Sequence, residues 1–199
     1  MKLKCKSPQA LEIVRKEVAP LPCARDIHAK FQFINPLPGL NQPALEYLKA
    51  KIPDMKKPAE KVATIFFDEM KLEERGHYDK RNDYVLGPHS QANQVMARSI
   101  GGDWKVPIYT LFDVDLTKPT LTEIICALEE IGIHVLLIVC DQGGKNLGLP
   151  KELGITTENV SFPNPFDPSR VVFFAYDFVH TMKNLRLKCS ENIMTASSF

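Results

Sequence analysis

Three apolar segments of strand length each end at an aspartate, and this repeated arrangement constrains the fold of the chain more than any other feature. The segments with their aspartates are Val62–Phe67 with Asp68, His134–Cys140 with Asp141, and Val171–Tyr176 with Asp177. Because both faces of such a segment are apolar, each predicts a strand buried within a sheet. In an open α/β sheet, ligands bind where the carboxyl ends of parallel strands meet. If the first two strands are adjacent and parallel, Asp68 and Asp141 therefore reach one site.

The segments between and before these strands favour helices, a hairpin and one further strand. Helices are predicted over 120–131, 146–153 and 178–187, a hairpin over 78–87, and a strand over 106–112. Ser90–Asn93 most simply starts a helix or an edge segment. Meandering strands followed by αβαβα is the element order of the ribonuclease H-like fold, in which the first and fourth strands are parallel neighbours. We predict an α/β protein with a ribonuclease H-like mixed sheet, of which this chain holds a part, preceded by a small helical segment.

The first 55 residues have the pattern of short helices separated by prolines. Ser7 is a helix N-cap with Pro8 at the first helical position, and Asn41 can cap a later helix that Pro53 ends. Such short helices form either a helix-turn-helix unit that binds DNA or a helical lead-in packed on the next domain. We expect a helical lead-in over 1–55, a ribonuclease H-like domain over 60–188 and a tail over 189–199.

Composition excludes several classes of protein. The 25 basic and 24 acidic residues give a net charge of +1, so no overall basic excess indicates nucleic-acid binding. The five cysteines form no C-x-x-C pair, which argues against a disulfide scaffold or a zinc finger and favours a reducing compartment. The longest apolar run, Val135–Cys140, is far shorter than the roughly 20 residues that span a bilayer. We expect a soluble intracellular protein without a signal peptide or a membrane partner.

Carboxylates at strand ends have two interpretations. Paired oxygen ligands from Asp68 and Asp141 suit Mg²⁺ or Mn²⁺, and two such ions activate a nucleophile and stabilise the leaving oxygen of a phosphodiester. Alternatively, aspartate at a strand end caps a helix or makes a turn. Additional candidates for the same site are Glu69, Asp177, His180 and Asn146. The sequence has no phosphate-binding P-loop, no G-x-S-x-G nucleophile elbow and no H-E-x-x-H motif.

Four segments in the same order resemble motifs of the P element transposase family. They are Phe67–Leu72 around the first aspartate, Gly101–Tyr109 with the pattern G-x-W-K-x-P, Ile138–Asn146 around the second aspartate, and Asp177–Arg186 with the pattern D-x-x-H-x-x-K. The resemblance covers roughly residues 60 to 188. It implies a ribonuclease H-like domain that cuts and joins DNA with an aspartate–aspartate–glutamate triad and divalent metal. Asp68 and Asp141 match the first two acids of this triad.

The resemblance also implies two departures from the family. The family's third acid, a glutamate, lies downstream of the D-x-x-H motif, and a GTP-binding domain is inserted before it. This chain ends at Phe199, so we expect it to be truncated before both, and we expect no GTP binding. A two-metal site needs ligands beyond two carboxylates, so we expect strand transfer to be lost or impaired.

Three hypotheses follow. The first is a truncated or domesticated transposase module with a vestigial Asp68–Asp141 metal pair, which binds DNA or an intact transposase and resides in the nucleus. The second is a working nuclease whose site is completed by Asp177, Glu69, Glu191 or a partner chain. The third is a non-catalytic interaction protein that uses an exposed apolar face or strand edge, for example to form a homo-oligomer.

Overall fold

The structure, a computed structural model, describes Arg15, Cys23 and residues 37–79, 83–141, 148–183 and 185–186. The chain divides into two units at Asn35 and Pro36, and nearly all described residues belong to the second unit. The helices predicted between Ser7 and Phe31 lie outside the described residues. Among the residues that the structure describes, no helix is long and apolar enough to cross a membrane.

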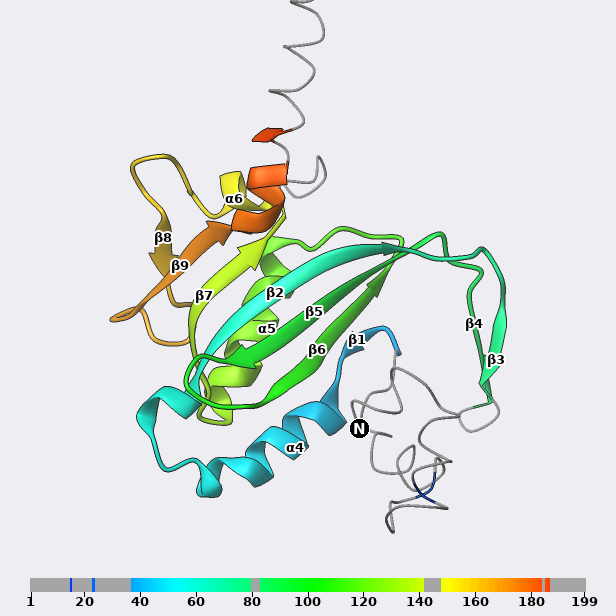
Figure 1. Cartoon of the computed structure of the whole chain (residues 1–199), viewed down its shortest axis with the longest axis horizontal. Coiled ribbons are helices and arrows are strands. Elements are labelled where there is room, and N and C mark those ends of the chain that lie inside the picture. Colours follow the sequence, from blue (N-terminus) through cyan, green and yellow to red (C-terminus); the bar gives the residue numbers. More distant parts are fainter. Residues whose placement is uncertain are drawn as a thin grey trace, which may run out of the picture. The chain divides into compact units, whose positions relative to one another are not determined.

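A mixed sheet of seven strands forms the centre of the second unit (Figure 1). In spatial order these strands are β1 (Gly39–Leu40), β6 (Lys105–Phe112), β5 (Gln91–Ser99), β2 (Val62–Lys71), β7 (His134–Cys140), β9 (Val171–Tyr176) and β8 (Ser161–Pro163). β2, β5 and β6 form an antiparallel meander, whereas β2 and β7, and also β7 and β9, are parallel pairs. The first and fourth strands of the core are thus parallel neighbours, as the element order predicted.

Helix α5 (Lys118–Glu130) covers one face of this sheet (Figure 1). Thr117 caps its first turn through a side-chain oxygen, and Gly132 takes up a φ of +88° just after its end, a conformation that favours glycine. The apolar stripe of the helix is fully buried, with Leu121, Ile124, Ile125 and Leu128 at most 1% exposed. The predicted helix over 120–131 is therefore confirmed, and it packs on strands that are buried from this side.

Strand β2 shows how the two faces of the sheet differ. Ala63, Ile65 and Phe67 are buried on one face, while Phe66 is half-buried and Asp68 is exposed on the other. This second face lies in front of the strands in Figure 1. It also carries side chains from neighbouring strands that are half-buried or exposed, namely Met96, Leu137, Val139 and Phe173. We call it the open face, and it is the face on which the candidate site lies.

Helix α4 (Gln42–Lys51) begins where Asn41 was expected to cap it. The Asn41 side chain accepts a hydrogen bond from the amide of Ala44 and donates one to the carbonyl oxygen of Pro107 on β6. Ala44, Leu45 and Leu48 bury one side of the helix, which belongs to the second unit. Two 3-10 turns, Ile52–Asp54 and Pro58–Lys61, then lead into β2.

Two segments differ from the sequence-based prediction. The predicted hairpin exists, but β3 (His77–Asp79) and β4 (Tyr84–Leu86) form a separate two-stranded sheet. The segment Ser90–Asn93 starts neither a helix nor an edge segment: it enters β5, which is hydrogen-bonded to β2 on one side and β6 on the other. Its Gln, Ala and Asn residues have low β-propensity, so cross-strand pairing decides this conformation.

The remaining elements lie near the carboxyl ends of β7 and β9. The helix expected over 146–153 is a short α6 (Gly148–Glu152), and residues 142–147 lie outside the described part. A helix starts at Phe178, directly after Asp177, as predicted. Because β7 and β9 are parallel to β2, all three strands end at the same edge of the sheet.

Candidate active site

The strand register brings the three aspartates to one level of the sheet. Phe67 of β2 pairs with Cys140 of β7, so Asp68 and Asp141 are the next residues on two adjacent parallel strands. Cys140 in turn pairs with Tyr176 of β9, which Asp177 follows. The amide of Asp177 donates a hydrogen bond to the carbonyl oxygen of Cys140 at 2.7 Å. Parallel pairing therefore continues to this edge, where the three carboxyl-bearing residues lie on adjacent strands.

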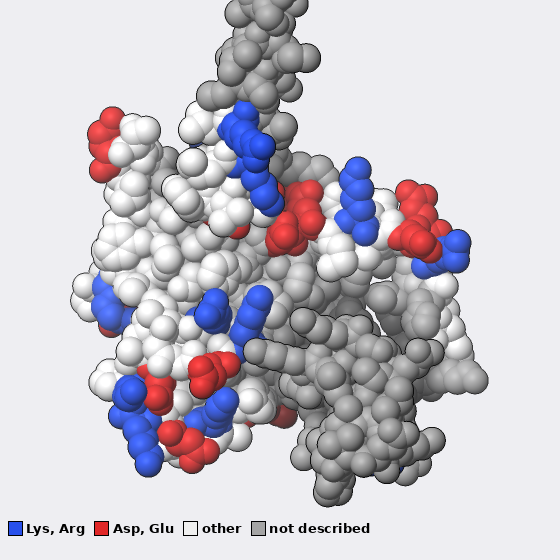
Figure 2. All heavy atoms as spheres, in the orientation of Figure 1, with Lys and Arg blue, Asp and Glu red and all other residues white. Residues whose placement is uncertain are grey.

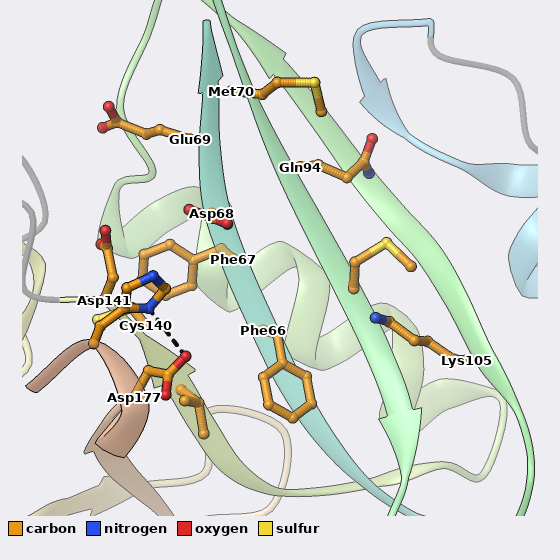
Figure 3. Close-up of a pocket in the computed structure, with 13 residues that line it drawn as sticks. Phe66, Phe67, Asp68, Glu69, Met70, Gln94, Lys105, Cys140, Asp141 and Asp177 are labelled. Atoms are coloured by element: carbon orange, nitrogen blue, oxygen red, sulfur yellow. Dashed lines mark hydrogen bonds and ion pairs between the residues drawn. The ribbon is translucent and has the colours of Figure 1, made fainter. Parts of the chain in front are cut away.

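These residues line a single pocket of about 310 Å³ that opens on the open face (Figure 3). Its acidic side consists of Asp68, Glu69, Asp141, Asp177 and His180. Its other side is formed by residues of the antiparallel meander, namely Phe66, Met70, Gln94, Met96 and Lys105. The pocket thus has carboxylates at one end, an apolar floor and one cation at the other end.

Asp177 has a well-defined local role. Its carboxylate accepts hydrogen bonds from the amide of Val179 at 2.8 Å and shares one with Nδ1 of His180 at 3.1 Å (Figure 3). The hydrogen bond from Val179, together with His180, lowers the pKa of Asp177 below its ordinary value, although partial burial opposes this shift. Asp177 is therefore a helix N-cap, as aspartates at strand ends often are, and it orients the His180 ring in the pocket.

Asp68 and Asp141 differ in environment. The Asp68 side chain is exposed and has no hydrogen bond or ion pair within the described part of the chain, whereas Asp141 is half-buried. Beneath them, burial and then the charge of Asp141 raise the pKa of the Cys140 thiol to about 12. The thiol is consequently protonated at neutral pH. The donors at this end of the pocket are carboxylate oxygens, which suit Mg²⁺ or Mn²⁺.

The carboxylates of Asp68, Asp141 and Asp177 line this end of the pocket, and that of Asp177 is engaged by Val179 and His180. Within the described ranges, no group of three or more His, Cys, Asp or Glu side chains is arranged to hold a metal ion. The chemistry of the donors fits a hard divalent cation, and their number fits one loosely held ion better than two.

The predicted site residues are brought together with two exceptions. Asp68, Asp141, Glu69, Asp177 and His180 all line the pocket, and Asn146 and Glu191 lie outside the described residues. Sequence reasoning missed Gln94 and Lys105. Gln94 lies on β5, which runs away from this edge, and Lys105 is the first residue of β6, far from the end of that strand. The polar residues Gln94 and Arg98 fall on the opposite face from the apolar residues Val95 and Ala97, and this period of two, typical of a half-buried strand, is the signal that could have found Gln94.

Comparisons with known proteins agree with this fold. Residues 36–154 match the family described as "TNP-like, RNase H N-terminal domain". The "Transposable element P transposase" of Drosophila melanogaster is 32% identical over 128 residues, which are 64% of this chain and 17% of that protein. A solved structure, "Drosophila P element transposase strand transfer complex", matches 92% of this chain and 41% of its own chain with a TM-score of 0.74 and 26% identity. The chain thus spans less than half the length of both relatives.

Proposed function

Because this chain belongs to the family of TNP-like RNase H N-terminal domains, we propose that it binds DNA and one divalent metal ion at the pocket of Asp68 and Asp141. The observation that carries the proposal is the register of β2, β7 and β9, which ends three parallel strands in aspartates around one pocket. The similarity to a transposase in a strand transfer complex supports DNA as the partner. We place the protein in the nucleus, where such a partner resides.

Each residue of the pocket has a distinct part in this function. Asp68 and Asp141 would hold Mg²⁺ or Mn²⁺, and the ion, when bound, supplies positive charge that stabilises the oxygens of a phosphodiester under attack. Asp177 positions His180 by accepting from its Nδ1, which leaves Nε2 of the neutral ring as a hydrogen-bond acceptor. Glu69 adds a further carboxylate beside the pair and is the candidate for an additional ligand.

The ancestral chemistry is metal-dependent cleavage and strand transfer on DNA, and we propose that it is lost or impaired in this chain alone. Two carboxylates leave a second ion without enough ligands to fix both the attacking and the leaving oxygen. The absence of a three-ligand group within the described residues supports this proposal. Loss of one member of a cooperating catalytic set typically removes most of the rate acceleration.

A non-catalytic binding module is the second candidate function. Apolar side chains are exposed near the site, with Phe178 72%, Val179 57% and Leu185 55% exposed on the helix after β9. Such side chains favour a protein partner, which includes a second copy of this chain or an intact transposase. Sedimentation of the protein without metal or DNA would detect self-association.

Mn²⁺ titration by calorimetry tests the proposed function. We expect the wild type to bind Mn²⁺ and the Asp68→Asn/Asp141→Asn variant to lose this binding, because amides are weak ligands for a hard cation. The matched control is Asp54→Asn/Asp103→Asn, which removes two carboxylates from a different pocket and should bind like the wild type. Circular dichroism verifies that each variant is folded.

Three other results would each contradict a different part of the proposed function. A folded wild type that binds no Mn²⁺ contradicts the metal site and leaves the non-catalytic module. Binding that survives in the Asp68→Asn/Asp141→Asn variant shows that Mn²⁺ binds elsewhere. If cleavage of labelled DNA with Mn²⁺ occurs and Asp68→Asn abolishes it, the claim of impaired catalysis is wrong.

A further inference from the structure

Two cations face each other across neighbouring strands of the open face. Arg98 of β5 pairs directly with Lys105 of β6, and both side chains are exposed. Along β5, Gln94, Met96 and Arg98 point to the same face because side chains alternate along a strand. The two cations therefore lie on the same face as the pocket, and Lys105 itself lines the pocket.

This pair has no acidic partner. Neither the Arg98 nor the Lys105 side chain forms an ion pair or a hydrogen bond with any residue that the structure describes. Like charges directly opposite each other on antiparallel strands are destabilising, because their side chains are only about 5 Å apart. An anion placed between them would offset this repulsion, so the pair has the charge arrangement of an anion-binding site.

The pair lies at a defined distance from the acidic end of the pocket. In the register of β2 and β5, Asp68 pairs with Gln94 and Thr64 pairs with Arg98. Four residues along a strand correspond to about 13 Å. Between the two ends lie Phe66 and Met96, which are an uncharged cross-strand pair. Along the open face, the carboxylates at the end of the pocket are thus separated from the two cations by the apolar side chains of Phe66 and Met96.

The figures support this arrangement. Figure 3 shows the Lys105 side chain directed from β6 toward β5 and β2, with Phe66 between it and Asp177 in this view. Figure 2 shows basic side chains over the middle of the open face, with uncharged residues to their left and acidic side chains just below them. Within the pocket, Lys105 lies on the side opposite Asp141 and Asp177, so the pocket has two ends of opposite sign.

We propose that Arg98 and Lys105 bind phosphate groups of the DNA strand that enters the acidic pocket. This inference rests on the proposed function. It assigns the residues that contact the same DNA strand at some distance from Asp68 and Asp141. Along the axis of duplex DNA each strand advances about 3.4 Å per nucleotide, so 13 Å corresponds to roughly four nucleotides of a duplex. Arg98 can contact a phosphate in bidentate fashion, whereas Lys105 acts as a point charge. Both are positioning residues, because they contact the strand away from the reacting phosphate.

The salt dependence of DNA binding tests this assignment. The variant Arg98→Gln/Lys105→Gln is compared with the wild type by fluorescence anisotropy with a labelled single-stranded oligonucleotide, without metal, at several salt concentrations. Loss of two phosphate contacts should reduce the slope of log K against log salt by about 1.4. Affinity at low salt should fall roughly tenfold or more. The control Lys49→Gln/Lys56→Gln removes the same charge from exposed sites on and after α4 and should leave the slope unchanged.

A second readout separates the assignment from a loss of fold. Because the variant relieves a like-charge pair, its free energy of unfolding without DNA should equal or exceed that of the wild type. The single variant Arg98→Lys keeps the charge and should retain the wild-type slope, which confirms that charge at this position is what matters.

Three results would overturn the inference. The first is an unchanged slope in the double variant, which leaves DNA binding and the proposed function intact. The second is an equal loss in the control variant, which means that any two surface cations contribute alike. The third is a wild type that binds Mn²⁺ but no DNA. This result contradicts both the inference and the proposed binding of DNA, and it leaves the proposed metal site intact.

Discussion

At the scale of single residues, Glu129 is the buried charge that fixes the end of the sheet opposite the pocket. Its side chain is 1% exposed and accepts two hydrogen bonds from Arg170, at 3.1 and 2.7 Å. Asn164, the amide of Val135 and His134 donate to the same carboxylate. Burial raises the pKa of Glu129, but these hydrogen bonds outweigh it and the pKa is lowered. One carboxylate thus joins α5, β7 and the turn between β8 and β9.

We predict that Glu129→Ala lowers the free energy of unfolding by about 3 kcal/mol, because Arg170 and Asn164 lose their buried partner. The neighbouring Glu130→Ala is the control, since Glu130 is exposed, and its effect should stay within about 0.5 kcal/mol. Urea unfolding with an unchanged m-value provides the measurement. Equal effects of the two substitutions would contradict a structural role for the Glu129 cluster.

At the scale of elements, Asn41 connects helix α4 to the sheet. The residue is 9% exposed, caps α4 through its side-chain oxygen and donates from its amide nitrogen to Pro107 of β6. The backbone amide of Asn41 also donates a hydrogen bond, to the carbonyl oxygen of Ile108 at 2.8 Å. One side chain thus provides both the helix cap and a hydrogen bond from α4 to β6. The start of the helix is therefore fixed relative to this side of the sheet.

We predict that Asn41→Ala costs about 2 kcal/mol in unfolding free energy, of which about 1 reflects the cap and the rest the unpaired carbonyl of Pro107. Asn41→Ser retains a capping oxygen but cannot donate to Pro107, so it should recover roughly half of the loss. Chemical denaturation of both variants checks the order. A serine variant as unstable as the alanine variant would show that the hydrogen bond to Pro107 outweighs the cap.

At the scale of the whole molecule, the carboxylates of Asp113 and Asp167 accept hydrogen bonds from neighbouring residues that favour their ionised form. His89 and then Ser90 lower the pKa of Asp113 to about 2 by hydrogen bonding, and Ser169 and Arg170 do the same for Asp167. The unfolded chain has ordinary values near 3.8 for these groups and binds protons first as the pH falls. Their contribution to stability is therefore complete above about pH 4 and is lost as the pH falls toward 2.

We predict that the unfolding free energy is nearly constant from pH 7 to 5 and declines between pH 4 and 2. Asp113→Asn should make this decline shallower, and asparagine tolerates the φ of +55° at this position. The exposed Asp115→Asn serves as the control and should keep the slope of the wild type. Urea midpoints at each pH give the measurement, and an identical decline in the wild type and both variants would exclude Asp113 as a source.

Much of the fold could be predicted from local sequence pattern. The continuous apolar segments before Asp68, Asp141 and Asp177, and the helical stripe over 120–131, each report their own conformation because burial requires a fixed period of apolar residues. The element order then leads to the ribonuclease H-like class, which the family match and the structural similarity confirm. The metal-binding role of Asp68 and Asp141 remains a prediction.

Only the tertiary structure decided which strands are neighbours and in what register. Local pattern did not place 91–99 at the centre of the sheet or exclude the hairpin from it, because strand pairing depends on contacts between distant segments. The same register places Arg98 directly opposite Lys105. It also places Lys105 in the lining of a pocket whose acidic residues belong to other segments. The sequence by itself therefore determined the elements and the acids at their ends. The sheet determined what those acids face, since a side chain's neighbours follow from register and not from period.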